Sequence, residues 1–195
     1  MITIKSDREI ELMKQAGAIV WDTHQYLKQF IKAGITTKEL DEKANDFIIK
    51  AGATPSFKNL YGFPGTICIS INDEVVHGIP GKRKLKNGDI ITLDIGACYK
   101  GYHGDSAWTY PVGKISPAKQ KLLHDTEESL FVGLSTIKEG AHVGDIGYAI
   151  EQYAHKHNLG VVEELCGHGV GTAVHEDPDV PNFGIKGSGP VLKAG

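Results

Sequence analysis

The sequence has 195 residues, 41% of them hydrophobic, and 24 acidic against 21 basic residues give it a formal net charge of −3. This length and composition suit one sizeable domain, and the acidic balance argues against a nucleic-acid-binding or membrane-surface protein. Because no apolar stretch reaches the roughly 18 residues of a membrane span and no apolar signal core opens the chain, a soluble, unexported protein is expected. Three cysteines, an odd number, indicate a reducing compartment, the cytoplasm.

The N-terminal part of the chain predicts two amphipathic helices. The first, over about 7–33, has an apolar stripe that includes Trp21 and His24, and a histidine on such a stripe is expected to be packed in the core. The second, over about 37–51, follows a threonine that can cap it and stops at the next glycine.

Shorter elements follow. The pieces "GTICISI" (65–71) and "EVVHGI" (74–79) read as strands. Beyond a serine cap with proline at the first helical position, one helix is expected over 118–137 and another over 145–158.

Between these strands and helices, "LDIGACYKGYHGDSAW" (93–108) predicts a β-hairpin with its turn at 100–101. Counting back from the turn places Asp94 opposite Ala107 and puts Asp94 and Asp105 on one face, with the large apolar residues on the other. The acid face can meet water, as in many half-buried sheets, or it can bind a cation between converging carboxylates. The hairpin alone leaves both readings open.

An internal duplication is visible in the helical segments, because "FIKAGITTKELDEKANDFIIKAG" resembles "TIKEGAHVGDIGYAIEQYAHKHNLG" at an offset of about 106 residues. This predicts a single α+β domain, residues 1–195, made of pseudosymmetric halves over about 1–112 and 113–195, with a central antiparallel sheet and outer helices. Adding the offset to Asp94 and Asp105 leads past Gly195, so the second half is expected to be incomplete.

The segment "CGHGVGTAVHEDP" (166–178) carries His168 and His175 among glycines, which bring the backbone close to a site and expose imidazoles. The spacing does not fit a zinc-protease helix, and Cys166 is a weak candidate for a nucleophile. On this segment alone, functional and structural readings are equally favoured.

Three motifs, "VVHGIP", "LDIGACYKGYHGDSAW" and "CGHGVGTAVHEDP", in this order and spacing resemble bacterial type I methionine aminopeptidases of the M24 peptidase family. The resemblance covers essentially the whole chain. It implies the pita-bread fold, whose two pseudosymmetric halves agree with the duplication.

The resemblance implies two divalent metal ions held by Asp94, Asp105 and His168, with Asp105 bridging them. Carboxylates with one imidazole suit Mn, Fe, Co or Zn. The family's two glutamate ligands follow a segment corresponding to "LKAG" and are not in this sequence. A C-terminally truncated chain is therefore expected, and whether it is active by itself is left open.

By the same resemblance, His77 and His175 are the catalytic histidines that donate hydrogen bonds to the scissile peptide. Phe63 and Cys68 are expected to line the slot for the methionine side chain. Weaker candidates for that slot are Phe57, Leu60 and Tyr61. Val174 departs from the family, which often has phenylalanine there, so the side-chain preference is left open.

The implied function is metal-dependent removal of the N-terminal methionine from nascent polypeptides by a metal-activated water, in the cytoplasm and near the ribosome. The expected protein is a monomer without direct nucleic-acid or membrane partners. Two alternatives are a non-catalytic binding module with the same fold and a proline-specific or creatine-hydrolysing relative. The short N-terminus counts against these last relatives, which usually carry an extra N-terminal domain.

Overall fold

The computed structural model describes residues 2–195, and the chain divides into two compact units. The larger unit comprises Arg8–Gln120 and Gly171–Val174. The smaller unit comprises the N-terminal residues up to Asp7, Lys121–Val170 and His175–Gly195. Within residues 2–195, no helix has the length and apolarity needed to cross a membrane.

Two helices open the chain. Helix α1 (Asp7–Lys28) buries a stripe that includes Val20, His24 and Leu27, so the expected core histidine is confirmed. Trp21 was expected on this stripe, but 54% of it is exposed, because it lies roughly a third of a turn away from the centre of the buried face.

Helix α2 (Thr37–Lys50) starts where the sequence predicts. Thr36 closes a capping box: its Oγ1 accepts a hydrogen bond from the Glu39 backbone N–H at 3.1 Å, and the Glu39 carboxylate accepts one from the Thr36 N–H at 2.8 Å. These bonds satisfy two backbone donors that a helix start leaves unpaired.

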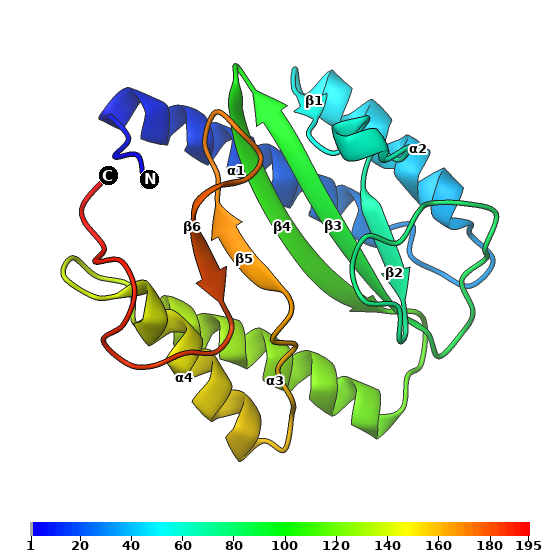
Figure 1. The fold of residues 1–195 in the computed structure, drawn as a ribbon. Helices are drawn as coiled ribbons and strands as arrows, with labels where there is room; N and C mark the ends of the chain where they lie inside the picture. Colours follow the sequence, from blue (N-terminus) through cyan, green and yellow to red (C-terminus); the bar gives the residue numbers. More distant parts are fainter. Residues whose placement is uncertain (1) are drawn as a thin grey trace. The chain divides into compact units, whose positions relative to one another are not determined.

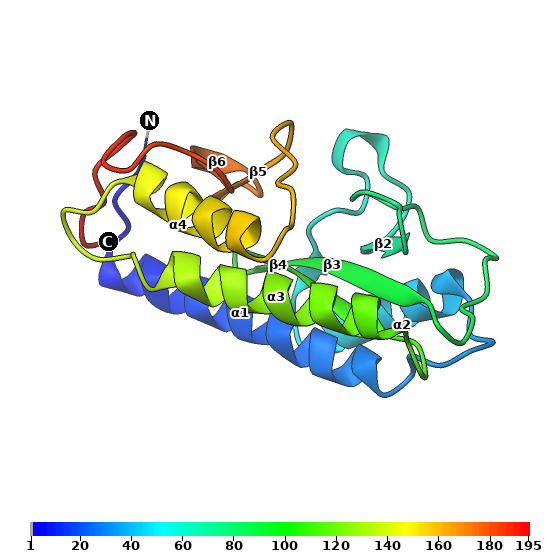
Figure 2. The same cartoon turned by 90° about the horizontal axis from the view of Figure 1, so that it is seen from below.

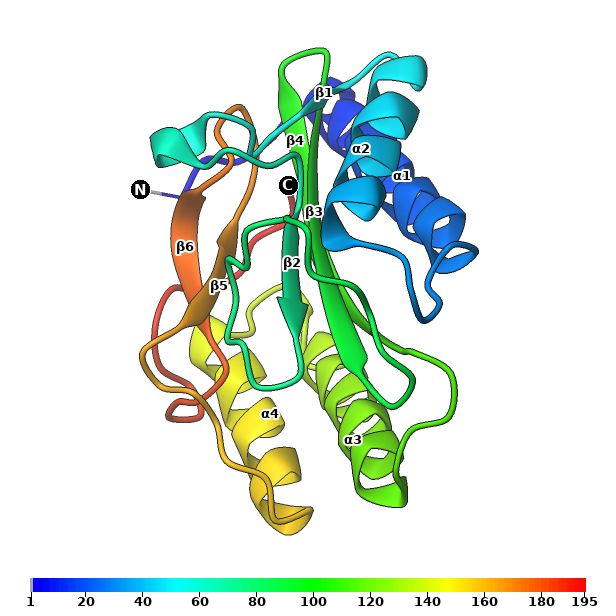
Figure 3. The same cartoon turned by 90° about the vertical axis from the view of Figure 1, so that its right-hand side faces the viewer.

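A four-stranded antiparallel sheet forms the framework of the larger unit (Figure 3). Its strands are β1 (Thr54–Pro55), β2 (Cys68–Ile71), β3 (Ile90–Tyr99) and β4 (Tyr102–Pro111), with a short 3₁₀ turn, η1 (Leu60–Gly62), between β1 and β2. Strand β3 pairs with each of the other three.

The β3–β4 hairpin has the predicted register, with Tyr99 opposite Tyr102 and Asp94 opposite Ala107. Lys100 and Gly101 in the turn have φ angles of 49° and 87°. Two successive left-handed residues are what a two-residue turn needs to match the twist of its strands.

The core lies on the face of the hairpin opposite the acids, as predicted. Ile91, Leu93 and Ile95 of β3 are completely buried there, in one cluster with Val20 and Leu27 of α1. Figures 1 and 2 show α1 running along this face of β3 and β4. The face that carries the aspartates is only half-buried.

The segment 74–79 does not form a strand, contrary to the sequence prediction. Val76 and His77 have φ angles of 43° and 47°, which an extended strand excludes. The apolar residues that suggested a strand stay exposed: Val75, Val76 and Ile79. A β-branched pattern thus predicts a strand even where the backbone adopts left-handed angles that a strand excludes.

The smaller unit contains most of helix α3 (Pro117–Leu134), with helix α4 (Val143–Lys156) and strands β5 (Cys166–Gly169) and β6 (Glu176–Pro181). Strands β5 and β6 form an antiparallel hairpin, and α4 lies beside β6 (Figure 1). The approach of α4 depends on Gly147, where a Cβ would lie 2.5 Å from the Pro181 carbonyl oxygen. Helix α3 ends three residues earlier than expected.

Candidate active site

The larger unit brings the two predicted aspartates together. Asp94 of β3 and Asp105 of β4 lie on the same face, and their carboxyl groups are hydrogen-bonded. Burial raises the pKa of Asp105 to about 6, and the hydrogen bond with Asp94 acts in the opposite direction. A carboxylate has no hydrogen to donate, so this bond requires one proton in the pair. Such a pair is a candidate cation site.

Cys68 of β2 is the neighbour of Asp94 across the sheet. Burial raises the pKa of its thiol to about 12, and the negative charges of Asp94 and Asp105 act in the same direction. A thiol that stays protonated at neutral pH is neither a nucleophile nor a soft metal ligand. The protonated Cys68 side chain contributes apolar surface beside the acids.

The Phe57 ring limits the space beside the acid pair. Gly96, opposite Asp105, has no side chain, but the Phe57 ring occupies that side: a Cβ on Gly96 would lie 2.6 Å from it. The acid face is therefore open along only part of its length.

A small apolar cluster adjoins the acids through Cys68. Phe57, Cys68 and Val174 are buried in it, and Leu60 and Phe63 pack against them. Four of the five predicted slot residues are thus gathered. Tyr61 is not among them, because 91% of it is exposed. The membership of Val174 depends on contacts between distant parts of the chain, for which the sequence carries no local signal.

Two hydrogen-bonded groups that the sequence analysis missed support this region. The Asp41 carboxylate of α2 accepts bonds from the Thr66 and Ile67 backbone N–H groups at 2.7 and 2.9 Å, which fixes the chain just before Cys68. The His103 backbone N–H donates to the Gly171 carbonyl at 2.8 Å and so holds the segment that carries Val174.

His77 lies on the loop after β2, exposed and with a left-handed backbone. The next residue, Gly78, fastens the loop: its carbonyl accepts from the Ile69 N–H at 2.9 Å, and its N–H donates to Ser70 Oγ at 3.3 Å. A Cβ on Gly78 would lie 2.1 Å from the Ile69 carbonyl oxygen, so only glycine fits there. The hydrogen bonds of Gly78 to β2 therefore hold the backbone next to His77 in place.

The smaller unit brings the other two histidines together. The rings of His168 on β5 and His175, just before β6, have centroids 4.3 Å apart. His168 Nδ1 lies 2.9 Å from the Gly169 carbonyl oxygen, which accepts only, so Nδ1 carries a hydrogen and donates it. Nε2 is then the nitrogen with metal-binding chemistry.

Neither unit by itself completes a metal centre. Within residues 2–195, neither unit gathers three or more histidine, cysteine, aspartate or glutamate side chains around one point. The larger unit contains the carboxylate pair, and the smaller unit contains His168 and His175.

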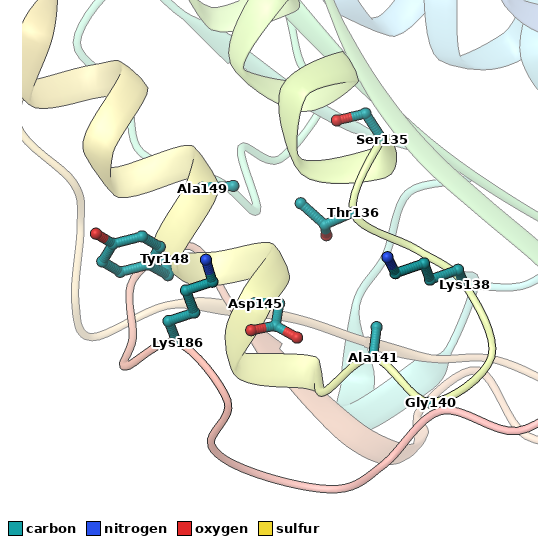
Figure 4. Close-up of a pocket in the computed structure, with 9 residues that line it drawn as sticks. All are labelled: Ser135, Thr136, Lys138, Gly140, Ala141, Asp145, Tyr148, Ala149 and Lys186. Atoms are coloured by element: carbon teal, nitrogen blue, oxygen red, sulfur yellow. The ribbon is translucent and has the colours of Figure 1, made fainter.

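A surface cavity of about 470 Å³ in the smaller unit contains none of the predicted site residues. Figure 4 shows Asp145 between Lys138 and Lys186 at its edge. The Asp145 carboxylate accepts hydrogen bonds from the His142 and Gly187 backbone N–H groups, both at 2.8 Å, so it has a structural role at the start of α4. The catalytic candidates therefore lie outside this cavity.

Comparison with known proteins identifies the group to which this arrangement belongs. Residues 11–195 match the model of metallopeptidase family M24. Over its whole length the chain is 55% identical to methionine aminopeptidase 1 of Bacillus subtilis, of which it covers 79%. The crystal structure of methionine aminopeptidase from Rickettsia prowazekii superposes with a TM-score of 0.97 at 38% identity, over 99% of this chain and 78% of that one.

A more distant likeness bears on the proline-specific alternative. The Xaa-Pro dipeptidase from Bacillus anthracis is 26% identical, with a TM-score of 0.80 over 95% of this chain and 56% of its own. The expected pita-bread fold is confirmed by the much closer match to the Rickettsia structure. Both identity and coverage favour the methionine aminopeptidases.

Proposed function

Since the chain belongs to metallopeptidase family M24, we propose that it is a methionine aminopeptidase, which hydrolyses the bond after an N-terminal methionine. The observation that carries the proposal is the hydrogen-bonded acid pair, Asp94 and Asp105, beside the apolar cluster formed around Cys68. A catalytic polar group next to an apolar recess is the general form of a site that cuts beside one apolar side chain.

We propose that Asp94, Asp105 and His168 hold two divalent metal ions. The donor chemistry fits, because a cation can replace the proton of the carboxyl pair, and His168, whose Nδ1 donates to the Gly169 carbonyl, has Nε2 left as the metal-binding nitrogen. Two carboxylates and an imidazole, with the thiol of Cys68 kept protonated, favour Mn, Fe, Co or Zn. A bound divalent metal supplies a water that is acidic enough to act as a nucleophile at neutral pH.

The remaining residues bind and orient the substrate. Phe63 and Cys68 offer apolar surface to the methionine side chain, and Val174 occupies less of the recess than phenylalanine would. The buried wall excludes water from the thioether side chain, which stabilises binding in proportion to the apolar area covered. His77 and His175 donate hydrogen bonds to the scissile peptide and to the oxyanion that develops there.

The cellular setting is part of the proposal. Cys68, Cys98 and Cys166 form no disulfide, which fits a reducing cytoplasm. We propose that the protein acts there as a monomer on nascent chains close to the ribosome.

The test uses the protein produced from its complete gene, supplied with manganese, cobalt or ferrous iron and a peptide that begins Met-Gly. Free methionine should be released, and none should be released from the same peptide with an acetylated N-terminus. Asp105→Asn should abolish release. The matched control is Asp22→Asn, on an exposed part of α1, which should leave release unchanged.

Each contrary result has a distinct meaning. No methionine release with any of the three metals contradicts the proposed function. Release only from peptides with proline in second place supports the proline-specific alternative. Full activity of Asp105→Asn contradicts the assigned role of the acid pair.

A further inference from the structure

A buried histidine lies beneath the acid pair in the larger unit and has no part in the proposed chemistry. His24 of α1 is only 2% exposed. Its Nε2 lies 3.1 Å from the Ser106 carbonyl oxygen and 3.2 Å from Ser106 Oγ, and its Nδ1 lies 3.2 Å from the Tyr110 hydroxyl. Both ring nitrogens therefore contact β4, the strand that carries Asp105.

These contacts fix the state of the ring. Burial lowers the pKa of His24, so the imidazole is neutral at physiological pH and has one donor and one acceptor. The Ser106 carbonyl oxygen can only accept, so Nε2 carries the hydrogen, and the Tyr110 hydroxyl donates to Nδ1. With the hydrogen on Nε2, both ring nitrogens of His24 have a hydrogen-bond partner.

Helix α1 contacts β4 on both sides of Asp105. Ser106, the next residue, receives the hydrogen bond from His24. Gly104, the preceding residue, lies against the α1 backbone, where a Cβ would be 2.7 Å from the Gly17 nitrogen. Because side chains alternate along a strand, these core-side contacts hold the two residues whose backbone directs the Asp105 side chain to the opposite face.

Packing alone does not account for an imidazole at this place. A leucine would fill it without the cost of removing a polar ring from water. The neighbouring buried polar residue, Thr23, behaves differently from His24. Its hydroxyl donates a hydrogen bond to the Ile19 carbonyl of its own helix at 2.7 Å, whereas the His24 ring is hydrogen-bonded to β4.

We propose that His24 is a positioning residue for the acid pair: its hydrogen bond to Ser106 fixes the β4 backbone so that the Asp105 carboxylate stays aligned with Asp94 for metal binding. The proposal rests on the proposed role of Asp105 as a metal ligand. It assigns to α1 a function at the opposite face of the sheet.

The test is manganese binding measured by calorimetry on the protein produced from its complete gene, so the result does not depend on turnover. His24→Leu should weaken binding by about tenfold, at the low end of effects seen for groups that orient metal ligands. His24→Gln, which can still donate to the Ser106 carbonyl, should stay within about twofold of wild type. Thr23→Val is the matched control, since it removes a buried hydroxyl of the same helix whose hydrogen bond goes to the Ile19 carbonyl of that helix.

A structural role and a positioning role give different patterns. His24→Leu and Thr23→Val should both lower the melting temperature, but only His24→Leu should weaken manganese binding. Wild-type affinity in a folded His24→Leu protein would overturn the proposal. If that variant does not fold, Tyr110→Phe decides, because it keeps His24 but removes the hydrogen bond to Nδ1 that holds the ring in place against β4. A loss of about threefold is expected, and no loss overturns the proposal.

The proposed function can fail separately. If wild type binds no manganese, or if Asp105→Asn binds it as well as wild type, the assignment of the metal site is wrong. If Asp105→Asn loses binding and His24→Leu does not, only the positioning role is wrong.

Discussion

Replacing Asp105 by asparagine should stabilise the metal-free protein at neutral pH while it destroys the metal site. Each tenfold change in an acid dissociation constant is about 1.4 kcal/mol. The pKa of Asp105, which titrates together with Asp94, is raised from 3.8 to about 6, so ionising this pair costs the folded protein stability on the order of 2–3 kcal/mol. Asparagine avoids this cost, and its side-chain carbonyl can still accept a hydrogen bond from Asp94, so a gain of about 2–3 kcal/mol is expected.

The sign of the pH dependence follows from the direction of the shift. The folded state holds the Asp105 proton more tightly than the unfolded state, so this group adds stability as the pH falls from 7 through 6 towards 4. The advantage of Asp105→Asn should be complete above about pH 7 and vanish near pH 4. The pKa of Glu39 is lowered by its hydrogen bond with the Thr36 side chain, so this carboxylate loses stabilising effect as the pH falls. Its contribution is the same in wild type and in Asp105→Asn, so it cancels when the two free energies of unfolding are subtracted.

The assay is urea unfolding of both proteins with a chelator present, followed by circular dichroism at several pH values. Asp22→Asn provides the control and should change the free energy of unfolding by less than about 0.5 kcal/mol. A variant that is less stable than wild type at pH 7.5, or a difference that does not change with pH, would refute a costly buried carboxyl at position 105. Manganese should reverse the order, since only wild type gains stability from binding it.

Three further predictions concern other parts of the molecule. His175→Ala should lower kcat by about 10²-fold and leave manganese affinity within about twofold of wild type; lost metal binding would instead make His175 a ligand. Phe63→Ala should raise KM for a Met-Gly peptide about tenfold, because apolar contact with the methionine is lost, whereas Tyr61→Ala should not change KM, since Tyr61 lies outside the cluster. Gly104→Ala should cost about 1–3 kcal/mol in thermal or urea unfolding, because its Cβ would meet the α1 backbone, and Gly160→Ala, which meets nothing, should cost less than about 0.5 kcal/mol.

The sequence alone predicts that Asp94 and Asp105 share a face of the hairpin, because their placement depends only on residues close to them in the chain. Lys100 and Gly101 specify a two-residue turn, and once the turn is placed the alternation of side chains determines that Asp94 and Asp105 share a face. The capping box at Thr36 is local in the same way.

The sequence did not predict features that depend on contacts between residues far apart in the chain. The pattern at 74–79 resembles a strand, yet the left-handed backbone at His77 and the fastening of Gly78 to β2 depend on the neighbouring strand. Val174 joins Phe57 although more than a hundred residues separate them in the chain. Periodicity placed Trp21 on the buried stripe, but the width of that stripe depends on what α1 packs against.

The two-residue turn between β3 and β4 also bears on how the protein folds. A hairpin closed by so short a turn pays little loop entropy, and isolated hairpins form in about 1–10 μs. The pairing of Asp94 with Ala107 is specified within these twenty-two residues, from Ile90 to Pro111, so the two carboxyls can approach each other before α1 has docked. During folding the like charges would then meet while still in water, where their repulsion is weak, and would become half-buried only when the segments that carry Phe57 and Cys68 pack beside them.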